Sequence, residues 1–300
     1  MSTNRLEQTS KYLQEKLLQW LPEHDQGIVQ TDIEGLTLSR YDSTFPPRKH
    51  FYQPTITVVL QGIKRSVIGN EEYIYGRNHC MVVGVNLPGV YQITEASSEK
   101  PFLSVALRLD KYTINQLLTE MPPCSLPEKE NIPGIVVSEV SQEIQDAFLR
   151  LIELLDNPTS IAVMAPMIIR EIHFLLLNSS QGDCLCFVNS TGTKSHQIVQ
   201  AVQWLKENYA QPLDVTSLAK LVNMSGSTFH RYFRQITTFS PLQLQKQLRL
   251  YEAERLMLLE GKNAKTAAFQ VGYESVPQFS REYKRQFGAA PHQDITKKRV

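Results

Sequence analysis

Apolar residues follow a helical spacing at both ends of this chain and a strand spacing between them. Leucines on one face predict a helix over residues 4–21, either an arm on the next domain or, as favoured, an ordinary N-terminal helix. From residue 28 to residue 110, β-branched and aromatic runs alternate with glycine-containing turns. Helical spacing then returns. The pattern predicts a multidomain α+β chain whose strands precede most of its helices.

The strand region contains short apolar runs at residues 55–60, 64–68, 71–75, 80–83, 90–93 and 102–109. Gly69-Asn70 and Gly76 to Asn78 supply two of the turns between these runs. Strands at such spacing are typical of a small sandwich or barrel. The pattern does not fix strand register, so it leaves open whether Tyr73 and Tyr91 point inward.

Behind the strands, a short helix at residues 111–121 is followed by two longer amphipathic helices. Their apolar faces consist of Val140, Ile144, Phe148, Leu151 and Leu155 in residues 138–155, and of Ile161, Met164, Ile168, Ile172 and Leu176 in residues 160–177. Pro158 separates the two, which favours an antiparallel pair. The second helix is apolar on several sides, so dimerisation is slightly favoured over packing on its own barrel.

Small polar residues between Asn178 and Lys194 predict a flexible linker, assigned to residues 181–194. Cys184 and Cys186 interrupt it. Such a pair can bind a metal, or sense oxidants or aldehydes if a thiol is activated. Two sulfurs without a nearby pair of histidines make an incomplete zinc site, so two reduced thiols are the favoured interpretation.

The N-terminus shows no secretory signal. We therefore expect all four cysteines (Cys80, Cys124, Cys184 and Cys186) to be free thiols in a reducing cytoplasm. The most apolar window, residues 161–177, carries Arg170, Glu171 and His173, which argues against a membrane span.

The region from Val215 to Pro291 contains one short pattern twice. Shifted by fifty positions, Ser225 meets Ser275, Phe229 meets Phe279, Arg231 meets Arg281 and Pro241 meets Pro291. Just upstream the shift is forty-nine, because Glu274 is an extra residue, and there Asn223 meets Gly272. The repeat indicates two copies of one structural unit.

Each copy predicts a helix, a tight turn and a second helix. Ser225 and Ser275 suit a helix N-cap, and Asn223 and Gly272 suit the residue with positive φ that ends the preceding helix. Each second helix carries two aromatic core residues four positions apart: Phe229 and Phe233, then Phe279 and Tyr283. Two helix-turn-helix units follow, at about residues 215–237 and 264–287, joined by a long helix that begins at Ser240-Pro241.

The net charge also differs between the C-terminal part that contains the repeat and the rest of the chain. Residues 194–300 hold 16 Lys+Arg and 8 Asp+Glu, a net charge of +8, whereas the remainder holds 15 and 22, a net charge of −7. The basic half suits contact with phosphates. With 300 residues and 42% hydrophobic content, the chain is long enough for two domains with cores of their own.

These motifs resemble the AraC/XylS family of bacterial transcription regulators. The C-terminal likeness is carried by Leu218-Ala219, residues 225–241, residues 268–273, Phe279 and residues 287–291. The N-terminal likeness is carried by Gln61-Gly62, Lys64, Tyr73, Tyr75, residues 87–89, Ala96-Ser97, Pro101, Asp110, residues 151–158, Ala165-Pro166 and Arg170-Glu171. The resemblance implies a cupin-like sensor barrel, a helical pair that commonly dimerises, and activation rather than repression.

In a helix-turn-helix, residues at the start of the second helix reach base edges. The exposed candidates in the first unit are Ser227, Thr228, His230 and Arg231; the resemblance transfers these positions to Val276, Pro277, Gln278, Ser280 and Arg281. Arg231 is the strongest candidate, since a guanidinium can donate to O6 and N7 of guanine together. Val276 and Pro277 offer no side-chain hydrogen bonds, so the second unit is expected to read fewer bases. Arg234, Lys284 and Arg285 are candidate phosphate contacts.

The sequence contains few features that would support enzymatic activity. The barrel region holds only His50 and His79, without the His-x-His spacing of metal-dependent cupins. A Gly-x-Ser-x-Gly motif and a glycine-rich phosphate loop are also missing from the sequence. We expect no catalytic residues, metal or cofactor. A cupin-type enzyme fused to a DNA-binding module is the less favoured alternative.

The sequence thus predicts a cytoplasmic regulator with a sensor and dimerisation domain at residues 1–180 (barrel about 28–110, helices about 111–178) and a DNA-binding domain at residues 195–300. Its expected partners are double-stranded DNA, a small-molecule effector in the barrel, RNA polymerase and a second copy of the chain. The alternative is a regulator controlled by protein contacts, which a barrel filled with side chains would favour.

Overall fold

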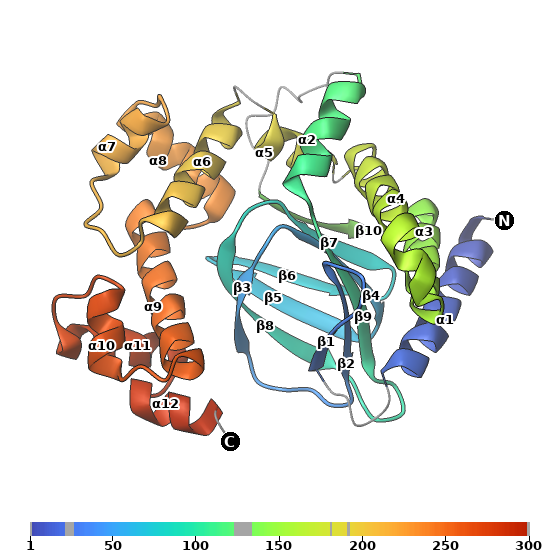
Figure 1. Ribbon diagram of the computed structural model, residues 1–300, viewed down its shortest axis with the longest axis horizontal. Coiled ribbons are helices and arrows are strands. Elements are labelled where there is room, and N and C mark those ends of the chain that lie inside the picture. The colour runs from blue at the N-terminus through green and yellow to red at the C-terminus, as the bar shows by residue number, and fades with distance from the viewer. Residues whose placement is uncertain (1, 22–26, 123–133, 181, 191–192, 299–300) are drawn as a thin grey trace. The chain divides into compact units, whose positions relative to one another are not determined.

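The computed structural model describes residues 2–21, 27–122, 134–180, 182–190 and 193–298 (Figure 1). Its contacts divide the chain into two compact units, Met1–His196 and Gln197–Val300, which we call unit 1 and unit 2 and describe separately. The described strands all belong to unit 1, and unit 2 is helical. This is the expected order of a β-rich N-terminal part and an all-α C-terminal part.

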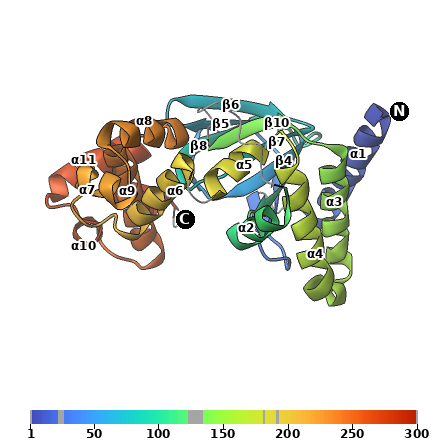
Figure 2. The ribbon, with the colours of Figure 1, turned by 90° about the horizontal axis from the view of Figure 1, so that it is seen from above.

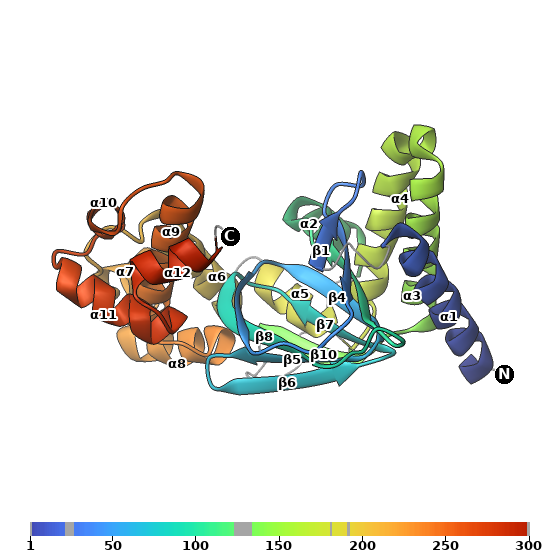
Figure 3. The same cartoon turned by 90° about the horizontal axis from the view of Figure 1, so that it is seen from below.

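The strands of unit 1 form two antiparallel sheets (Figure 3). They are β1 Gly27–Gln30, β2 Leu36–Tyr41, β3 Arg48–Tyr52, β4 Thr55–Gln61, β5 Ile63–Ile68, β6 Glu71–Gly76, β7 His79–Val83, β8 Leu87–Glu95, β9 Phe102–Arg108 and β10 Ile135–Glu139. The larger sheet has the order β1-β2-β9-β4-β7-β10 and the smaller one β3-β8-β5-β6. The predicted barrel-like architecture is confirmed, and Gly69 and Asn78 have the positive φ expected of turn residues.

Strand β10 was not expected from the sequence. It pairs with β7, from Ile135 opposite Val83 to Glu139 opposite His79. The predicted helix at 138–155 was therefore wrong at its start. Helix α3 spans Gln142–Glu153 and begins after Ser141, whose hydroxyl accepts a hydrogen bond from the backbone N–H of Ile144.

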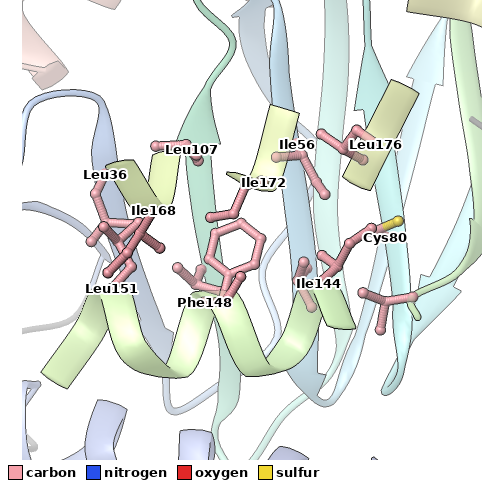
Figure 4. Packing of buried hydrophobic residues seen from close by; sticks show 14 of the residues in the cluster. Leu36, Ile56, Cys80, Leu107, Ile144, Phe148, Leu151, Ile168, Ile172 and Leu176 are labelled. Carbon is pink, nitrogen blue, oxygen red and sulfur yellow. The ribbon is translucent and has the colours of Figure 1, made fainter. Parts of the chain in front are cut away.

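Helices α1 (Ser2–Trp20), α3 and α4 (Pro158–Leu177) share one hydrophobic core with the larger sheet. Figure 4 shows Phe148 of α3 and Ile172 of α4 packed against Leu107 of β9. Residues 13, 17 and 21 are fully buried leucines, so α1 is an integral helix of unit 1 rather than a free arm. Helices α3 and α4 lie side by side as a pair, joined by the short helix η1 (Leu154–Asp156) (Figure 2).

Helix α4 differs from its predicted pattern in one position. Ile168, Ile172 and Leu176 are buried as expected, but Met164 is 40% exposed, and the neighbouring Ala165 is buried instead. By length and composition α4 is apolar enough to cross a membrane, although its charged residues had been expected to exclude this. In the structure, 33% of its most apolar window is buried inside unit 1.

His173 occupies a buried position on the inner side of α4, close to helix α2 (Lys111–Glu120). Its Nε2 accepts a hydrogen bond from the backbone N–H of Asp110 at 2.9 Å, and its Nδ1 lies 2.6 Å from the carbonyl oxygen of Ile169. A neutral imidazole with its proton on Nδ1 satisfies both contacts. Burial lowers the pKa of His173, which agrees with that neutral form.

The residues expected to form a flexible linker contain helix α5 (Gly182–Asn189) instead. Cys184 and Leu185 are buried, so this segment packs into unit 1. The expectation of four free thiols was wrong, because Cys186 is disulfide-bonded. Cys80 and Cys184 are free and buried, whereas Cys124 lies outside the described residues.

Unit 2 consists of two similar helical units on either side of a long central helix. Its helices are α6 Lys194–Glu207, which starts just before the unit boundary, α7 Val215–Leu221, α8 Gly226–Thr237, α9 Pro241–Leu259, α10 Ala264–Gln270, α11 Val276–Phe287 and α12 Pro291–Lys298. Helix α9 begins as predicted. Ser240 and Gln243 form a reciprocal capping box, and Pro241 occupies the first turn.

Candidate nucleic-acid interface and barrel cavity

Helix pairs α7–α8 and α10–α11 have the geometry of two helix-turn-helix units. The turn residues Asn223 and Gly272 have φ of 56° and 87°, as predicted. Ser225 and Ser275 cap the second helix of each unit, accepting hydrogen bonds from the backbone N–H groups of residues 228 and 278, respectively. The two second helices, α8 and α11, lie on the same side of unit 2 (Figures 2 and 3).

The predicted core residues of both units are buried. Phe229, Phe233, Phe279 and Tyr283 have no exposed surface, and successive rings pack at 5.3 Å in α8 and 5.5 Å in α11. These side chains fix which faces of α8 and α11 turn outward. The residues on the opposite face of each helix are consequently presented to solvent.

The predicted base-reading residues differ in exposure. On α8, Ser227, His230 and Arg231 are exposed, whereas Thr228 is half-buried and its hydroxyl accepts a hydrogen bond from that of Ser225. On α11, Pro277, Gln278 and Arg281 are exposed, whereas Val276 and Ser280 are half-buried. Val276 packs against the core of the second unit, which leaves less of it available to a thymine methyl. The predicted phosphate contacts Arg234, Lys284 and Arg285 are all exposed.

The pattern missed a carboxylate on α11. Glu282 is 21% exposed at its side chain and forms an ion pair of 3.0 Å with Lys246 of α9. It also accepts hydrogen bonds from the hydroxyl of Tyr273 at 2.8 Å and from the amide of Gln278 at 3.3 Å. Gln278 is thus held on its own helix.

Arg249 of α9 connects the two helix-turn-helix units, a role that the sequence did not suggest. Its Nε donates to the carbonyl oxygen of Tyr209 at 2.7 Å, and one Nη donates to that of Gln211 at 3.0 Å. The other Nη donates to the carbonyl oxygen of Gly272 at 2.8 Å. One guanidinium therefore binds the loop before α7 and the turn of the second unit, which opposes independent movement of the two units.

At this junction, the backbone of Gly272 lies close to the backbone of Ala210. A Cβ atom at this position would lie 2.1 Å from the carbonyl oxygen of Ala210. Glycine is thus required here for two reasons: it adopts the positive φ without strain, and it has no side chain to clash with Ala210. The corresponding turn residue of the first unit, Asn223, tolerates the same φ because asparagine adopts this conformation more readily than most residues.

Unit 1 contains a cavity of about 570 Å³ between its two sheets. It is lined by Ile28, Gln30, Thr31, Glu34, Gly35, Thr37, Ser39, His50, Phe51, Tyr52, Gln53, Thr55, Thr57, Lys64, Tyr91, Ser104, Ala106 and Arg108. Its size falls within the usual range of small-molecule sites. The register of β8 places Tyr91 in the lining of the cavity. Tyr73 of β6 is half-buried and does not belong to this lining.

The side chains of the smaller sheet set the electrostatics of this cavity. Burial, with a contribution from the charge of Lys64, lowers the pKa of His50 to about 4, so this imidazole is neutral near pH 7. Burial lowers the pKa of Lys64 to about 8. Among the described residues, no group of three or more His, Cys, Asp or Glu side chains is placed to hold a metal ion.

Two helix-turn-helix units fixed by a central helix, in a chain that also carries a cavity-bearing β-domain, form the architecture typical of two-domain transcription regulators. A family model for the AraC-type transcriptional regulator N-terminus matches residues 32–184, and a helix-turn-helix domain model matches residues 218–296. The chain belongs to the AraC-type transcriptional regulators.

Among curated relatives, the HTH-type transcriptional activator RhaS of Pectobacterium carotovorum subsp. carotovorum is 29% identical over 153 residues. This match covers 50% of the present chain and 52% of RhaS, so the chain matches about half the length of that relative. The virulence regulon transcriptional activator VirF of Yersinia enterocolitica is 26% identical over 215 residues, which cover 71% of this chain and 72% of VirF.

Among solved structures, that of an apo lysine-to-alanine variant of ToxT from Vibrio cholerae is similar with a TM-score of 0.59 and 12% identity, covering 89% of this chain and 99% of ToxT. A second ToxT structure, with an unsaturated fatty acid bound, gives a TM-score of 0.58 at 12% identity and covers 89% of this chain and 97% of ToxT. At this identity the likeness establishes a shared fold.

Proposed function

We propose that this protein binds double-stranded DNA sequence-specifically, with α8 and α11 entering two adjacent major-groove segments. The observation that carries the proposal is the equivalent placement of Arg231 and Arg281. Both are exposed, each lies six positions after an N-cap serine, and their helices lie on one side of unit 2. Two units inserting into one face of a duplex would contact segments about 34 Å apart.

In this proposal the two helices have different tasks. Ser227, Thr228, His230 and Arg231 contact base edges from α8, with Arg231 donating to a guanine. On α11, Gln278, Ser280 and Arg281 contact bases, while Val276 and Pro277 contribute only apolar surface. Arg234, Lys284 and Arg285 bind phosphates and position the protein without reading sequence.

Footprinting on the DNA upstream of the protein's own gene tests the assignment. We expect protection over about two helical turns per monomer. Arg231→Ala should abolish the protected site, whereas Arg255→Ala should retain it. Arg255 is a matched control because it is an exposed arginine of unit 2 that forms ion pairs with Glu252 and Glu260 of its own region. Salt-dependent binding with no preferred site, equal in both variants, would refute the assignment of α8.

We further infer that a small molecule in the barrel cavity controls DNA binding by shifting an equilibrium between arrangements of the two units. The cavity supports a ligand over the alternative of a regulator controlled by protein contacts alone, which would have a filled barrel. ToxT with a bound fatty acid gives a precedent within the same fold. The relatives are named as transcription regulators, which supports a protein without enzymatic activity. RhaS and VirF are both named as activators, which supports activation here. Activation implies contact with RNA polymerase in the cytoplasm.

Helix α4 supports dimerisation. Val163, Met167 and Phe174 are 68%, 61% and 44% exposed, and their spacing of four and seven residues places them along one side of the helix. An apolar stripe of this kind suits a second copy of the chain. Replacing Met167 and Phe174 by glutamine should shift the protein toward monomer in analytical ultracentrifugation, while unchanged association would exclude this face.

A further inference from the structure

The two walls of the barrel cavity differ in chemistry. On the larger sheet, Ser39 lies directly opposite Ser104, and Thr57 lies opposite Ala106. The hydroxyls of Ser39, Thr57 and Ser104 make no hydrogen bond to another described residue, although their side chains are nearly buried. The opposite face of the same strands is aliphatic and packs on the helices. The cavity therefore presents a wall of free hydroxyl groups.

The smaller sheet contributes a cation to the facing wall. Side chains alternate along β5, so Lys64 shares a face with Ser66, which is fully buried and accepts a hydrogen bond from the hydroxyl of Tyr52 at 2.9 Å. The intervening Arg65 points the other way, into an exposed ion pair with Glu72. Lys64 lines the cavity, with its Nζ 5.0 Å from the ring centre of Tyr91.

Lys64 has no counter-charge in the described part of the chain. No carboxylate there lies within 4.0 Å of its Nζ, and burial alone accounts for its lowered pKa. The other ionic groups that line the cavity, Arg108 and Glu34, pair with each other at 2.6 Å, and both are more than half exposed. Lys64 is half-buried, and withdrawing an unpaired ammonium partly from water destabilises the empty protein. Such a group is retained when a ligand supplies the missing charge.

We propose that the barrel cavity binds a small, hydroxyl-rich carboxylate, with the carboxylate paired to Lys64 and the hydroxyl groups bonded to Ser39, Thr57 and Ser104. This inference rests on the proposal that the cavity is the effector site, and it specifies the class of effector. A single uncompensated cation matches a carboxylate better than a phosphate, which carries a charge of about −1.5 to −2 near pH 7. The hydroxyl wall disfavours a long acyl chain, since burying those hydroxyls against methylene groups would leave them unpaired.

Calorimetric titration of the full-length protein tests the assignment, using gluconate and shorter hydroxy acids of four or five carbons as probes. Each acid is paired with its neutral alcohol or amide, and glucose 6-phosphate and palmitoleate represent the other anion classes. At least one hydroxy acid should bind, and its neutral partner should bind at least tenfold more weakly. Absence of binding by every hydroxy acid, or tighter binding of palmitoleate or of the phosphate, would overturn the inference.

Two variants separate the role of Lys64 from general effects. Lys64→Met should weaken binding of the acid at least tenfold while raising the melting temperature of the empty protein, because it removes an unpaired, half-buried charge. Arg65→Met, on the outward side of the same strand, should leave binding unchanged. Equal affinity in wild type and Lys64→Met would refute the pairing. Footprinting of the same preparations distinguishes the two proposals, because DNA protection without acid binding contradicts only this inference.

Discussion

The two helix-turn-helix units of unit 2 share a scaffold but differ in the surface they present. Both have a positive φ at the turn, a serine N-cap and two buried aromatic residues on the second helix. On α8 the exposed positions include His230 and Arg231. On α11 the first two residues are Val276 and Pro277, and Gln278 is bonded to Glu282. The scaffold positions repeat because each is fixed by a backbone or core-packing requirement, whereas the surface positions carry no such constraint.

On the proposed function, this difference leads us to expect base discrimination mainly from the first unit and anchoring mainly from the second. The junction between them is also asymmetric. Gly272 of the second unit meets the backbone of Ala210, and Arg249 binds carbonyl groups on both sides. The second turn therefore serves the assembly of unit 2 as well as its own helix pair.

The largest effect is expected at the two turn residues. Gly272→Ala should destabilise unit 2 by at least ~3 kcal/mol, because it combines an unfavourable φ with a backbone overlap. Asn223→Ala should cost only about 1 kcal/mol, since the φ penalty acts alone. Urea unfolding followed through Trp204 fluorescence in a Trp20→Phe background measures both. Equal losses would show that the approach of Gly272 to Ala210 relaxes without cost.

The second test compares the equivalent arginines. Arg231→Ala should cost about 1–3 kcal/mol of preference for the correct base at one position of the operator, since it removes a bidentate contact. Arg281→Ala should cost less of this preference, because the second unit is expected to read fewer bases. Competition binding against operators with single base changes provides the measurement. A larger loss of preference from Arg281→Ala would reverse the assignment of the two units.

The helix caps should respond alike, which tests that the scaffold is shared. Ser225→Ala and Ser275→Ala should each cost about 0.5–2 kcal/mol of stability, because each removes one cap to a backbone N–H. Replacement by Asp should restore most of the loss in both units. Unfolding midpoints in urea report the values, and a cap that mattered in only one unit would contradict a common scaffold.

The smallest effect is expected at the phosphate contacts. Lys284→Ala and Arg285→Ala should each weaken binding to specific and nonspecific DNA to a similar degree and lower the salt slope by about 1. Titrations over a salt series measure this, with Arg255→Ala as the control. A change in base preference in either variant would move that residue to the base-reading group.

The helices of unit 2 could be predicted closely because their signals are local. An N-cap serine, a turn residue with positive φ and aromatic residues four apart each act over a few positions, so Ser225 and Phe229 carry the information themselves. The role of Arg249 in joining the two helix-turn-helix units was not predicted. This arginine lies on a helix whose pattern explains only its apolar side, and its carbonyl partners around residue 210 come close only after the chain folds.

The N-terminal part was predicted less completely. The strand runs and turns around Gly69 and Asn78 were found, but β10 and α5 were not. Strand β10 exists through its pairing with β7, some fifty residues earlier in the chain. Helix α5 lies in a sequence rich in small polar residues and is stabilised by the burial of Cys184 and Leu185. Such tertiary contacts override local propensity.

The sequence by itself determined the family, the order of a β-rich part and a double helix-turn-helix, and the caps and core aromatic residues of α8 and α11. These follow from periodicity and from backbone rules that act over a few residues. Only the tertiary structure decided which face of each strand lines the cavity, that Lys64 enters it without a counter-charge, and that Arg249 joins the two units. Register and strand neighbours are set by packing between distant segments, and no local pattern encodes them.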